Sequence, residues 1–335
     1  MFTPLSVSSG AKPVERTSFA EDVEYYLSLH PRQLPSRYLY DPLGSALFDA
    51  ICELPWYGIT RTERRLLQES ADEILAVGGP VRSFVELGPG NGEKLAILVA
   101  VATRLNGRGL MVHLVDVSPA ALAVAVRTLT AHPRVTVVTH EADYETGLAD
   151  VAPLATGGRT MALCLGSNIG NFDPPGAAML LEHIRSALSP GDTVLLGTDL
   201  VRAERDLLLA YNDPLGVTAA FNRNLLVRAN RELDADFDVR SFAHRAVWNG
   251  AALRVEMQLV STRAQTVRVP ASRLEVTFAE GDTIWTESSY KFRPGGVAIM
   301  LADAHFDVIG QWIDAGYALT LGRARAQGTR NLLRA

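Results

Sequence analysis

The sequence has few of the residues that build metal sites or disulfides. It contains two cysteines, Cys52 and Cys164, which lie too far apart to form a metal-ligand motif. Because both stand among apolar residues, we expect buried thiols. The seven histidines show no spacing typical of a metal site. The sequence therefore favours a metal-free protein of a reducing compartment.

Long apolar runs and runs of basic residues are also missing. No segment approaches the roughly 18 apolar residues of a membrane span, and the N-terminal residues lack the apolar core of a signal peptide. A formal net charge of -5 argues against nucleic acid or an anionic membrane as a partner. We therefore expect a cytoplasmic protein, and the lack of a coiled-coil pattern or a long apolar stripe favours a monomer.

What the sequence does contain is a regular alternation between Arg82 and Asp199. RSFVEL, LMVHLVDV, VTVVTH, TMALCLG and DTVLLGTDL have the apolar pattern of strands, and the segments between them that of helices. This alternation predicts a parallel sheet covered by helices on both faces. A final helix in GGVAIMLADAH and a hairpin in FDVIGQWIDAG and YALTLGRA would complete the sheet. Upstream, Thr60 and Glu63 have the spacing of a capping box that opens a helix.

After Asp199 the pattern changes to strands without intervening helices, in VRSFAHRAVWN, LRVEMQLVS, QTVRVP and RLEVTFAE. They predict an antiparallel meander inserted into a Rossmann-like α/β domain. The predicted division is a flexible tail (1–16), a substrate-binding lobe (17–62 and 200–290) and the Rossmann-like domain (63–199 and 291–335).

A glycine-rich loop, FVELGPGNGEK, follows the first strand of the alternating region and precedes a helix. Its glycines, Gly88, Gly90 and Gly92, let a ligand approach the backbone and the N–H groups at the helix start. Dinucleotide folds show G-x-G-x-x-G, whereas the spacing here is G-x-G-x-G. Glu86 could hold the amino-acid end of S-adenosylmethionine (SAM). The pattern favours SAM and leaves NAD as the alternative.

Acidic residues follow the next two strands. Asp116 ends the second strand and suits a ribose diol, and Asp143 follows the third and suits an adenine amine. Tyr144 is available to pack on the adenine ring. Either acid could instead serve a turn at the end of its strand. Their positions after successive strands favour a cofactor site.

Further polar residues stand where a substrate could bind. Gly166 and Asn171 follow the fourth strand of the alternating region, at the end where such folds place ligands, although they could form a simple Gly–Asn turn. Tyr57 and Tyr211 could supply hydroxyls or belong to the core. Met257 alternates with apolar neighbours and is expected in the core.

Glu287 and Ser289 stand two apart in WTESSYKFRP, and so on one face of an extended segment. A carboxylate and a hydroxyl together can bind the two nitrogens of an imidazole. The alternative is that Glu287 is a solvated surface residue.

These segments together resemble the ergothioneine-pathway L-histidine N-alpha-methyltransferases, from about Phe19 to Leu321. The resemblance implies a Rossmann-like class I SAM methyltransferase domain with an inserted α+β substrate-binding lobe. It also implies threefold methylation of histidine to trimethylhistidine (hercynine), with SAM as the methyl donor. The matching pieces are YDPLGSALFDAI, LPWYGITRTE, FVELGPGNGEK, LGSNIGN, LLGTDLV, AYNDPLGVTAAFNRNLL, NRELDADFD, VEMQL and TESSYKFRP.

The same resemblance implies roles for individual residues. SAM-binding positions fall on Tyr40, Gly88, Lys94, Asp116, Asp143 and Tyr144. Positions holding the carboxylate and amino end of the substrate fall on Asn171 and Tyr211, and positions around the imidazole on Tyr57, Glu287 and Ser289. Pocket-lining positions fall on Phe48 and Met257. Tyr40 and Asn171 are the candidates for a catalytic role near the reacting nitrogen.

Alternative functions remain open at this point. Asn168, Trp56 and Gly58 depart from the family pattern near the predicted pocket, so another amino acid or small amine, such as tryptophan, is the alternative substrate. An NAD-dependent reductase is disfavoured by the glycine spacing. A non-catalytic ligand-binding or scaffold protein is disfavoured by the intact set of polar residues.

Overall fold

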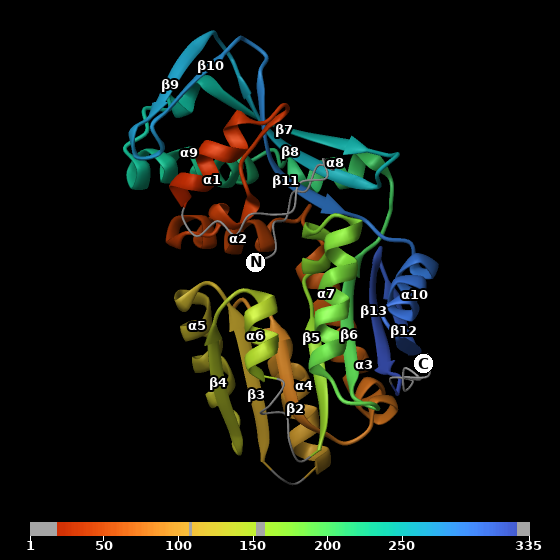
Figure 1. Cartoon of the computed structure of the whole chain (residues 1–335). Coiled ribbons are helices and arrows are strands. Elements are labelled where there is room, and N and C mark those ends of the chain that lie inside the picture. The colour runs from red at the N-terminus through yellow and green to blue at the C-terminus, as the bar shows by residue number, and fades with distance from the viewer. Residues whose placement is uncertain (1–18, 107–108, 152–157, 327–335) are drawn as a thin grey trace, which may run out of the picture.

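The computed structural model describes residues 19–106, 109–151 and 158–326, and its largest element is a β-sheet (Figure 1). In this described part of the chain the sheet has seven strands, in the order β12–β13–β6–β5–β2–β3–β4. The strands from β6 to β4 are parallel, whereas β13 runs antiparallel to β6 and to β12. They are β2 (Val81–Leu87), β3 (Leu110–Asp116), β4 (Val135–Glu141), β5 (Arg159–Cys164), β6 (Thr193–Asp199), β12 (Phe306–Asp314) and β13 (Tyr317–Ala324). The predicted parallel sheet with a final hairpin is confirmed.

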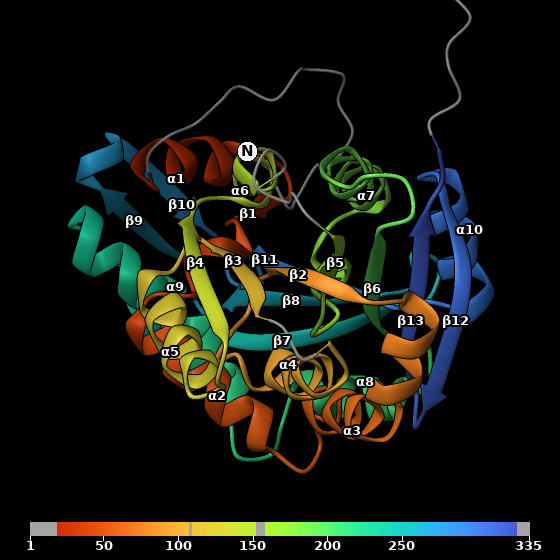
Figure 2. The same cartoon turned by 90° about the horizontal axis from the view of Figure 1, so that it is seen from below.

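Helices cover both faces of this sheet (Figures 1 and 2). The helices on one face are α3 (Ile59–Gly78), α4 (Glu93–Asn106) and α5 (Pro119–Thr130). Those on the other are α6 (Tyr144–Val151), α7 (Pro174–Ala187) and α10 (Pro294–Asp303). Because the central strands are buried on both sides, they are almost continuously apolar in sequence.

A second sheet, in the order β1–β11–β8–β7, lies over the carboxyl ends of the parallel strands (Figure 1). Its strands are β1 (Arg32–Gln33), β7 (Phe242–Asn249), β8 (Arg254–Ser261) and β11 (Thr283–Tyr290), and a separate pair is β9 (Gln265–Val269) and β10 (Leu274–Phe278). The accompanying helices are α1 (Phe19–Ser28), α2 (Pro42–Glu53), α8 (Glu204–Tyr211) and α9 (Val217–Leu233). The predicted antiparallel strands are confirmed, but they do not form one continuous meander, because β8 pairs with β11 and β9 pairs with β10.

The N-terminal segment joins this second sheet through β1, in which Arg32 lies opposite Ile284 of β11. It is also held at α2, whose N-cap Asp41 accepts hydrogen bonds from the Gly44 N–H and the Asn224 amide, both at 2.7 Å. This packing agrees with one lobe built from 17–62 and 200–290, although the boundaries stay a prediction. The predicted tail, 1–16, lies outside the described residues.

Helix caps agree with the sequence patterns in one case and not in another. Ser118, which stands directly before Pro119 and so at a position typical of a helix start, caps α5 by accepting a hydrogen bond from the Ala121 N–H at 3.3 Å. The capping box predicted for Thr60 and Glu63 is wrong, because α3 begins after Gly58 without a side-chain cap. The carboxylate of Glu63 instead accepts hydrogen bonds inside the protein.

Both cysteines are free thiols. Cys164 is buried as predicted, whereas the prediction is wrong for Cys52 on α2, which is only half-buried. None of the helices in the described ranges is long and apolar enough to cross a membrane.

Candidate active site

The glycine loop lies between β2 and α4 in a conformation that few residues other than glycine adopt. Gly88 and Gly90 have φ of 70° and 55°. A Cβ added at Gly88 would lie 2.6 Å from both the Tyr144 hydroxyl and the Asn168 amide nitrogen, whereas one at Gly90 would meet nothing within 4 Å. The loop therefore offers an open stretch of backbone next to the first turn of α4.

Glu86 stands at the end of β2, directly before this loop. It is 1% exposed, and its Oε2 has no hydrogen-bond partner among the described residues. Burial raises the pKa of this carboxyl to about 8, against the lowering influence of Lys94 and with the help of Glu63 and Asp116. A buried carboxyl without a partner is costly, so its presence here fits a ligand that brings a cationic or N–H donor.

The two acids predicted to contact the cofactor lie at the same edge of the sheet. Asp116 accepts a hydrogen bond from the Ser118 N–H at 2.8 Å, and burial raises its pKa. Asp143 accepts one from the Thr146 N–H at 2.9 Å, which lowers its pKa although burial opposes this. Both therefore take part in turns, as the alternative interpretation expected. Since a carboxylate has several acceptor sites, a turn role leaves room for a ligand.

These residues fit SAM, because an open glycine loop, an unpaired buried acid and Asp116 at the end of β3 lie at one edge of the sheet. Tyr144 completes this edge, and its ring lies 6.4 Å from that of Phe172. Nowhere in the described residues do His, Cys, Asp and Glu side chains gather in a group that could hold a metal ion.

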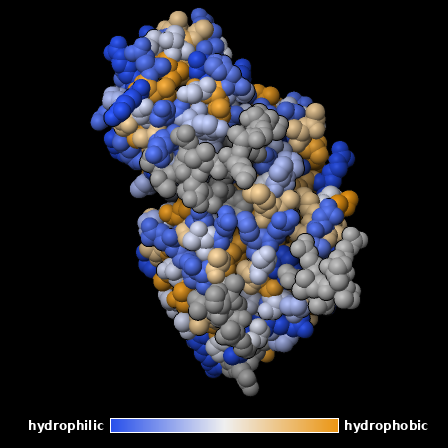
Figure 3. Space-filling model, in the orientation of Figure 1, coloured by the Kyte–Doolittle hydropathy of each residue, from blue (hydrophilic) through white to orange (hydrophobic). Residues whose placement is uncertain are grey.

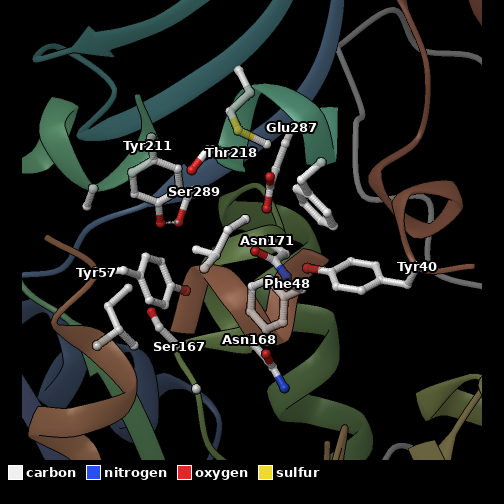
Figure 4. A pocket seen from close by; sticks show the side chains of 16 residues that line it. Tyr40, Phe48, Tyr57, Ser167, Asn168, Asn171, Tyr211, Thr218, Glu287 and Ser289 are labelled. Carbon is white, nitrogen blue, oxygen red and sulfur yellow. Dashed lines mark hydrogen bonds between the residues drawn. The ribbon is translucent and has the colours of Figure 1, made fainter. Parts of the chain in front are cut away.

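A pocket with about 500 Å³ of empty space, part of it open to solvent, lies next to this edge and beneath the second sheet (Figure 4). The structure brings all the predicted substrate residues to it. They come from the N-terminal segment, the loop after β5, α8, β8 and β11. They are Phe48, Tyr57, Gly166, Asn171, Tyr211, Met257, Glu287 and Ser289, and Tyr40 lines the pocket as well.

Aromatic rings form one wall of this pocket. Phe48 lies between Tyr40 and Tyr57, with ring centroids 5.5 and 6.2 Å away. Burial raises the pKa of both tyrosines well above the usual value, so each stays a neutral phenol near pH 7. Neither hydroxyl can therefore serve as a ready proton acceptor.

A buried lysine holds the hydroxyls on another side of the pocket. Lys291 is 0% exposed, and its Nζ donates to the Tyr211 hydroxyl and the Ser289 Oγ, both at 2.8 Å. The third partner is Asp199, whose Oδ2 lies 2.9 Å from Nζ. Tyr211 also donates to Ser289 at 2.7 Å. Tyr211, assigned to the amino end of the substrate, and Ser289, assigned to the imidazole, thus belong to one hydrogen-bonded cluster.

Glu287 points into the pocket from β11, toward the space that Asn171 also faces (Figure 4). It lies two residues before Ser289 on the same strand face, as the sequence predicts, and opposite Met257 of β8. The alternative interpretation, a solvated surface glutamate, is wrong, since Glu287 is only 7% exposed. Burial raises its pKa to about 7, although Lys291 lowers it.

Comparison with known families identifies this arrangement. Residues 19–325 match the profile of a family described as histidine-specific methyltransferase, SAM-dependent. The chain belongs to this family. It is therefore a SAM-dependent methyltransferase, with a Rossmann-like domain as the resemblance implied.

Individual relatives extend this finding. A histidine N-alpha-methyltransferase of Mycolicibacterium smegmatis is 40% identical, over 92% of this chain and 94% of that protein. One from Mycobacterium tuberculosis is 41% identical, over 88% and 90%. The N-methyltransferase fsqC of Aspergillus fumigatus is 30% identical, over 86% and 78%. The name of this third relative gives no substrate.

Two buried residues of this methyltransferase site, Lys291 and Glu63, were not predicted from the sequence to belong to it. Lys291 falls within the KFRP run that supported the resemblance, but a lysine gives no sign in sequence that it is buried. Glu63 was predicted as a helix cap, and its Oε2 instead accepts a hydrogen bond from Lys94 at 2.7 Å. The signal that could have pointed to it is its spacing of three and four residues from Leu66 and Leu67, which places a charged residue on the buried face of α3.

Proposed function

We propose that this enzyme transfers methyl groups from SAM to the α-amino nitrogen of L-histidine, three times in succession, to give hercynine for ergothioneine biosynthesis. The two histidine N-alpha-methyltransferases at about 40% identity support the substrate. The observation that carries the proposal is the pairing of Glu287 with Ser289 in a pocket walled by aromatic rings. The lobe formed by 17–62 and 200–290 would supply most of that pocket.

The hydrogen-bond donor left at Ser289 and the acceptor at Glu287 match a neutral imidazole. Its Oγ accepts from Lys291 and from Tyr211, so its own hydrogen remains to be donated to the pocket. Ionised Glu287 is an acceptor. One donor and one acceptor on the same strand face suit the bare nitrogen and the N–H of an imidazole ring.

The remaining polar groups suit the amino-acid end of histidine. The Tyr211 hydroxyl accepts from Lys291 and donates to Ser289, which leaves it one acceptor site for the amino group. The Asn171 amide can donate to the carboxylate. The buried positive charge of Lys291 favours that carboxylate electrostatically, although Asp199 offsets part of it.

The main task of the protein is to align the nitrogen with the methyl group. SAM would supply a methyl group bound to a sulfonium sulfur, and the neutral thioether of S-adenosylhomocysteine leaves readily, so orientation is the larger contribution of the protein. Because Tyr40 and Tyr57 stay protonated, we infer that the proton of the attacking amine passes to water. The rings of Tyr40, Phe48 and Tyr57 would favour the methylated ammonium by about 1–2 kcal/mol.

The Asp116→Asn variant tests the cofactor site. The amide oxygen can still accept from the Ser118 N–H, so the turn should persist. Loss of the charged acceptor should weaken SAM binding about 10- to 100-fold and leave histidine binding unchanged. Calorimetry with each ligand checks this, and intact SAM affinity would remove Asp116 from the ribose role.

Mass spectrometry of the purified enzyme incubated with SAM and the twenty amino acids tests the function itself. We expect histidine to gain one, two and then three methyl groups. Methylation of another amino acid, such as tryptophan, would favour the alternative substrate. It would also mean that the pocket around Asn168 and Glu287 binds a side chain other than imidazole. Binding of SAM without any methylation would point to a substrate outside this set.

We also propose a cytoplasmic monomer. Two free thiols suit a reducing compartment. On the face seen in Figure 3, hydrophobic residues lie in small patches among hydrophilic ones, as on the surface of many monomers. Size-exclusion chromatography with light scattering would test the monomer.

A further inference from the structure

The carboxylate of Glu63 contacts segments from both ligand sites. It lies on α3 and is 0% exposed. The Tyr317 hydroxyl donates to its Oε1 at 2.6 Å and Lys94 Nζ to its Oε2 at 2.7 Å, while the Gly166 N–H lies 2.9 Å from each oxygen. The Tyr317 hydroxyl in turn accepts from the Ser167 N–H at 3.0 Å.

One side of this network is the turn that leaves β5 for the substrate pocket. Gly166 and Ser167 have φ of 70° and 58°, two left-handed residues in succession, which is unfavourable for serine. Glu63 and Tyr317 bind the N–H groups of both residues. The turn leads into the 3₁₀ helix η2 (Asn168–Asn171), which carries the predicted substrate contact.

The other side of the network is the cofactor loop. Lys94 stands in the first turn of α4, directly after the glycine loop, and resemblance assigns it to SAM. Burial lowers its pKa, but Glu63 and Glu86 raise it above the usual value, so it stays charged. The space around Glu63 is kept by Gly197 on β6, where an added Cβ would lie 2.2 Å from the Glu63 Oε1.

We propose that Glu63 is a positioning residue that fixes the cofactor loop and the substrate turn relative to each other. It acts through Lys94 on one side and through Gly166 and Ser167 on the other. The proposal rests on the proposed function, which assigns these two segments to SAM and to histidine. Alignment matters because a displacement of about 1 Å can slow a transfer about 100-fold.

The Glu63→Gln variant tests this role. Three donors face the carboxylate, and an amide, which has a single oxygen and adds two donors, cannot accept from all of them. We expect kcat to fall about 30- to 100-fold, while the dissociation constants of histidine and S-adenosylhomocysteine change less than about 5-fold. Hydrogen exchange at the Gly166 and Ser167 amides should accelerate more than in the core of β5.

Asp192→Asn is the matched control. Asp192 is also buried and accepts from two backbone N–H groups, those of Thr160 and Ser189, at the opposite end of β5 and β6. This variant should lower the melting temperature and leave kcat within about 2-fold. The proposal is overturned if Glu63→Gln behaves in the same way, losing stability with kcat intact.

A second variant and amide exchange test the proposal if Glu63→Gln does not fold or if histidine is not the substrate. If Glu63→Gln does not fold, Tyr317→Phe removes one hydroxyl, and we expect an approximately 10-fold lower kcat; an unchanged kcat would overturn the proposal. If the wild-type enzyme does not methylate histidine, the proposed function fails, but amide exchange still reports on Glu63. Faster exchange at Gly166 and Ser167 in Glu63→Gln, and not in Asp192→Asn, supports the positioning role, and unchanged exchange refutes it.

Discussion

Replacing Glu287 with glutamine is expected to weaken histidine binding by about 30-fold or more, because a charged acceptor facing the imidazole N–H is lost. SAM binding should not change, since Glu287 lies on β11 of the second sheet, whereas the glycine loop follows β2 of the large sheet. The same variant should be more stable than the wild type above pH 7. Titration calorimetry with each ligand and urea unfolding between pH 5 and pH 8 measure these effects.

The sign of the stability effect follows from the pKa of Glu287, which burial raises from 4.5 to about 7. Between these values the unfolded chain loses a proton that the folded protein keeps, so stability falls as pH rises. Above pH 7 the full cost is present, on the order of 3 kcal/mol for a shift of this size. Glutamine removes this dependence because it does not ionise.

Glu256→Gln is the control for this experiment. Glu256 lies next to Met257 on β8, with its side chain on the opposite face of the second sheet, where it pairs with Arg254 at 2.8 Å. We expect its loss to leave histidine affinity unchanged. Unchanged histidine affinity in Glu287→Gln itself would contradict the assignment of Glu287 to the imidazole.

Replacing Glu86 with glutamine should have the reciprocal effect on the two ligands. SAM binding should weaken about 10- to 100-fold, because the cationic amino group of SAM would lose a buried carboxylate partner, while histidine binding persists. The free protein should again be stabilised, since burial raises the pKa of Glu86 to about 8 and ionisation at neutral pH is disfavoured. Calorimetry and urea unfolding at pH 5 and pH 9 measure both effects.

The two glutamine variants control for each other. Both remove a buried carboxyl, yet we expect each to affect a different ligand. The stability gain of Glu86→Gln should be small at pH 5, where the folded protein holds the proton, and should increase up to pH 9. A stability loss at pH 9, or loss of both ligands in either variant, would mean that the carboxyl supports the fold instead of a ligand.

Much of the fold could be predicted because its signals are local. The strands from β2 to β6 are apolar runs between amphipathic helices, and Ser118 before Pro119 marks a helix start by its own chemistry. The glycine loop was recognisable because few other residues adopt the φ values found at Gly88 and Gly90. Glu287 and Ser289 were placed on one face by the two-residue period of a strand.

Partners of buried charges could not be predicted in the same way. Thr60 and Glu63 satisfy the spacing of a capping box, but Glu63 meets Tyr317, which is 254 residues away in the chain. Lys291 meets Tyr211, 80 residues away. In sequence, such residues look the same as charged residues on the surface.

The sequence by itself determined the α/β architecture, the position of the glycine loop, the family and part of the pocket lining. Hydrophobic period, turn chemistry and motif order act over short stretches, and they therefore survive without knowledge of the fold. Only the tertiary structure decided that Glu86 is buried without a partner for its Oε2 among the described residues, that Glu287 is buried in the pocket, and that Glu63 and Lys291 are neutralised by ion pairs. The physical reason is that burial and pairing are set by segments that lie far apart in the chain and meet only in the folded protein.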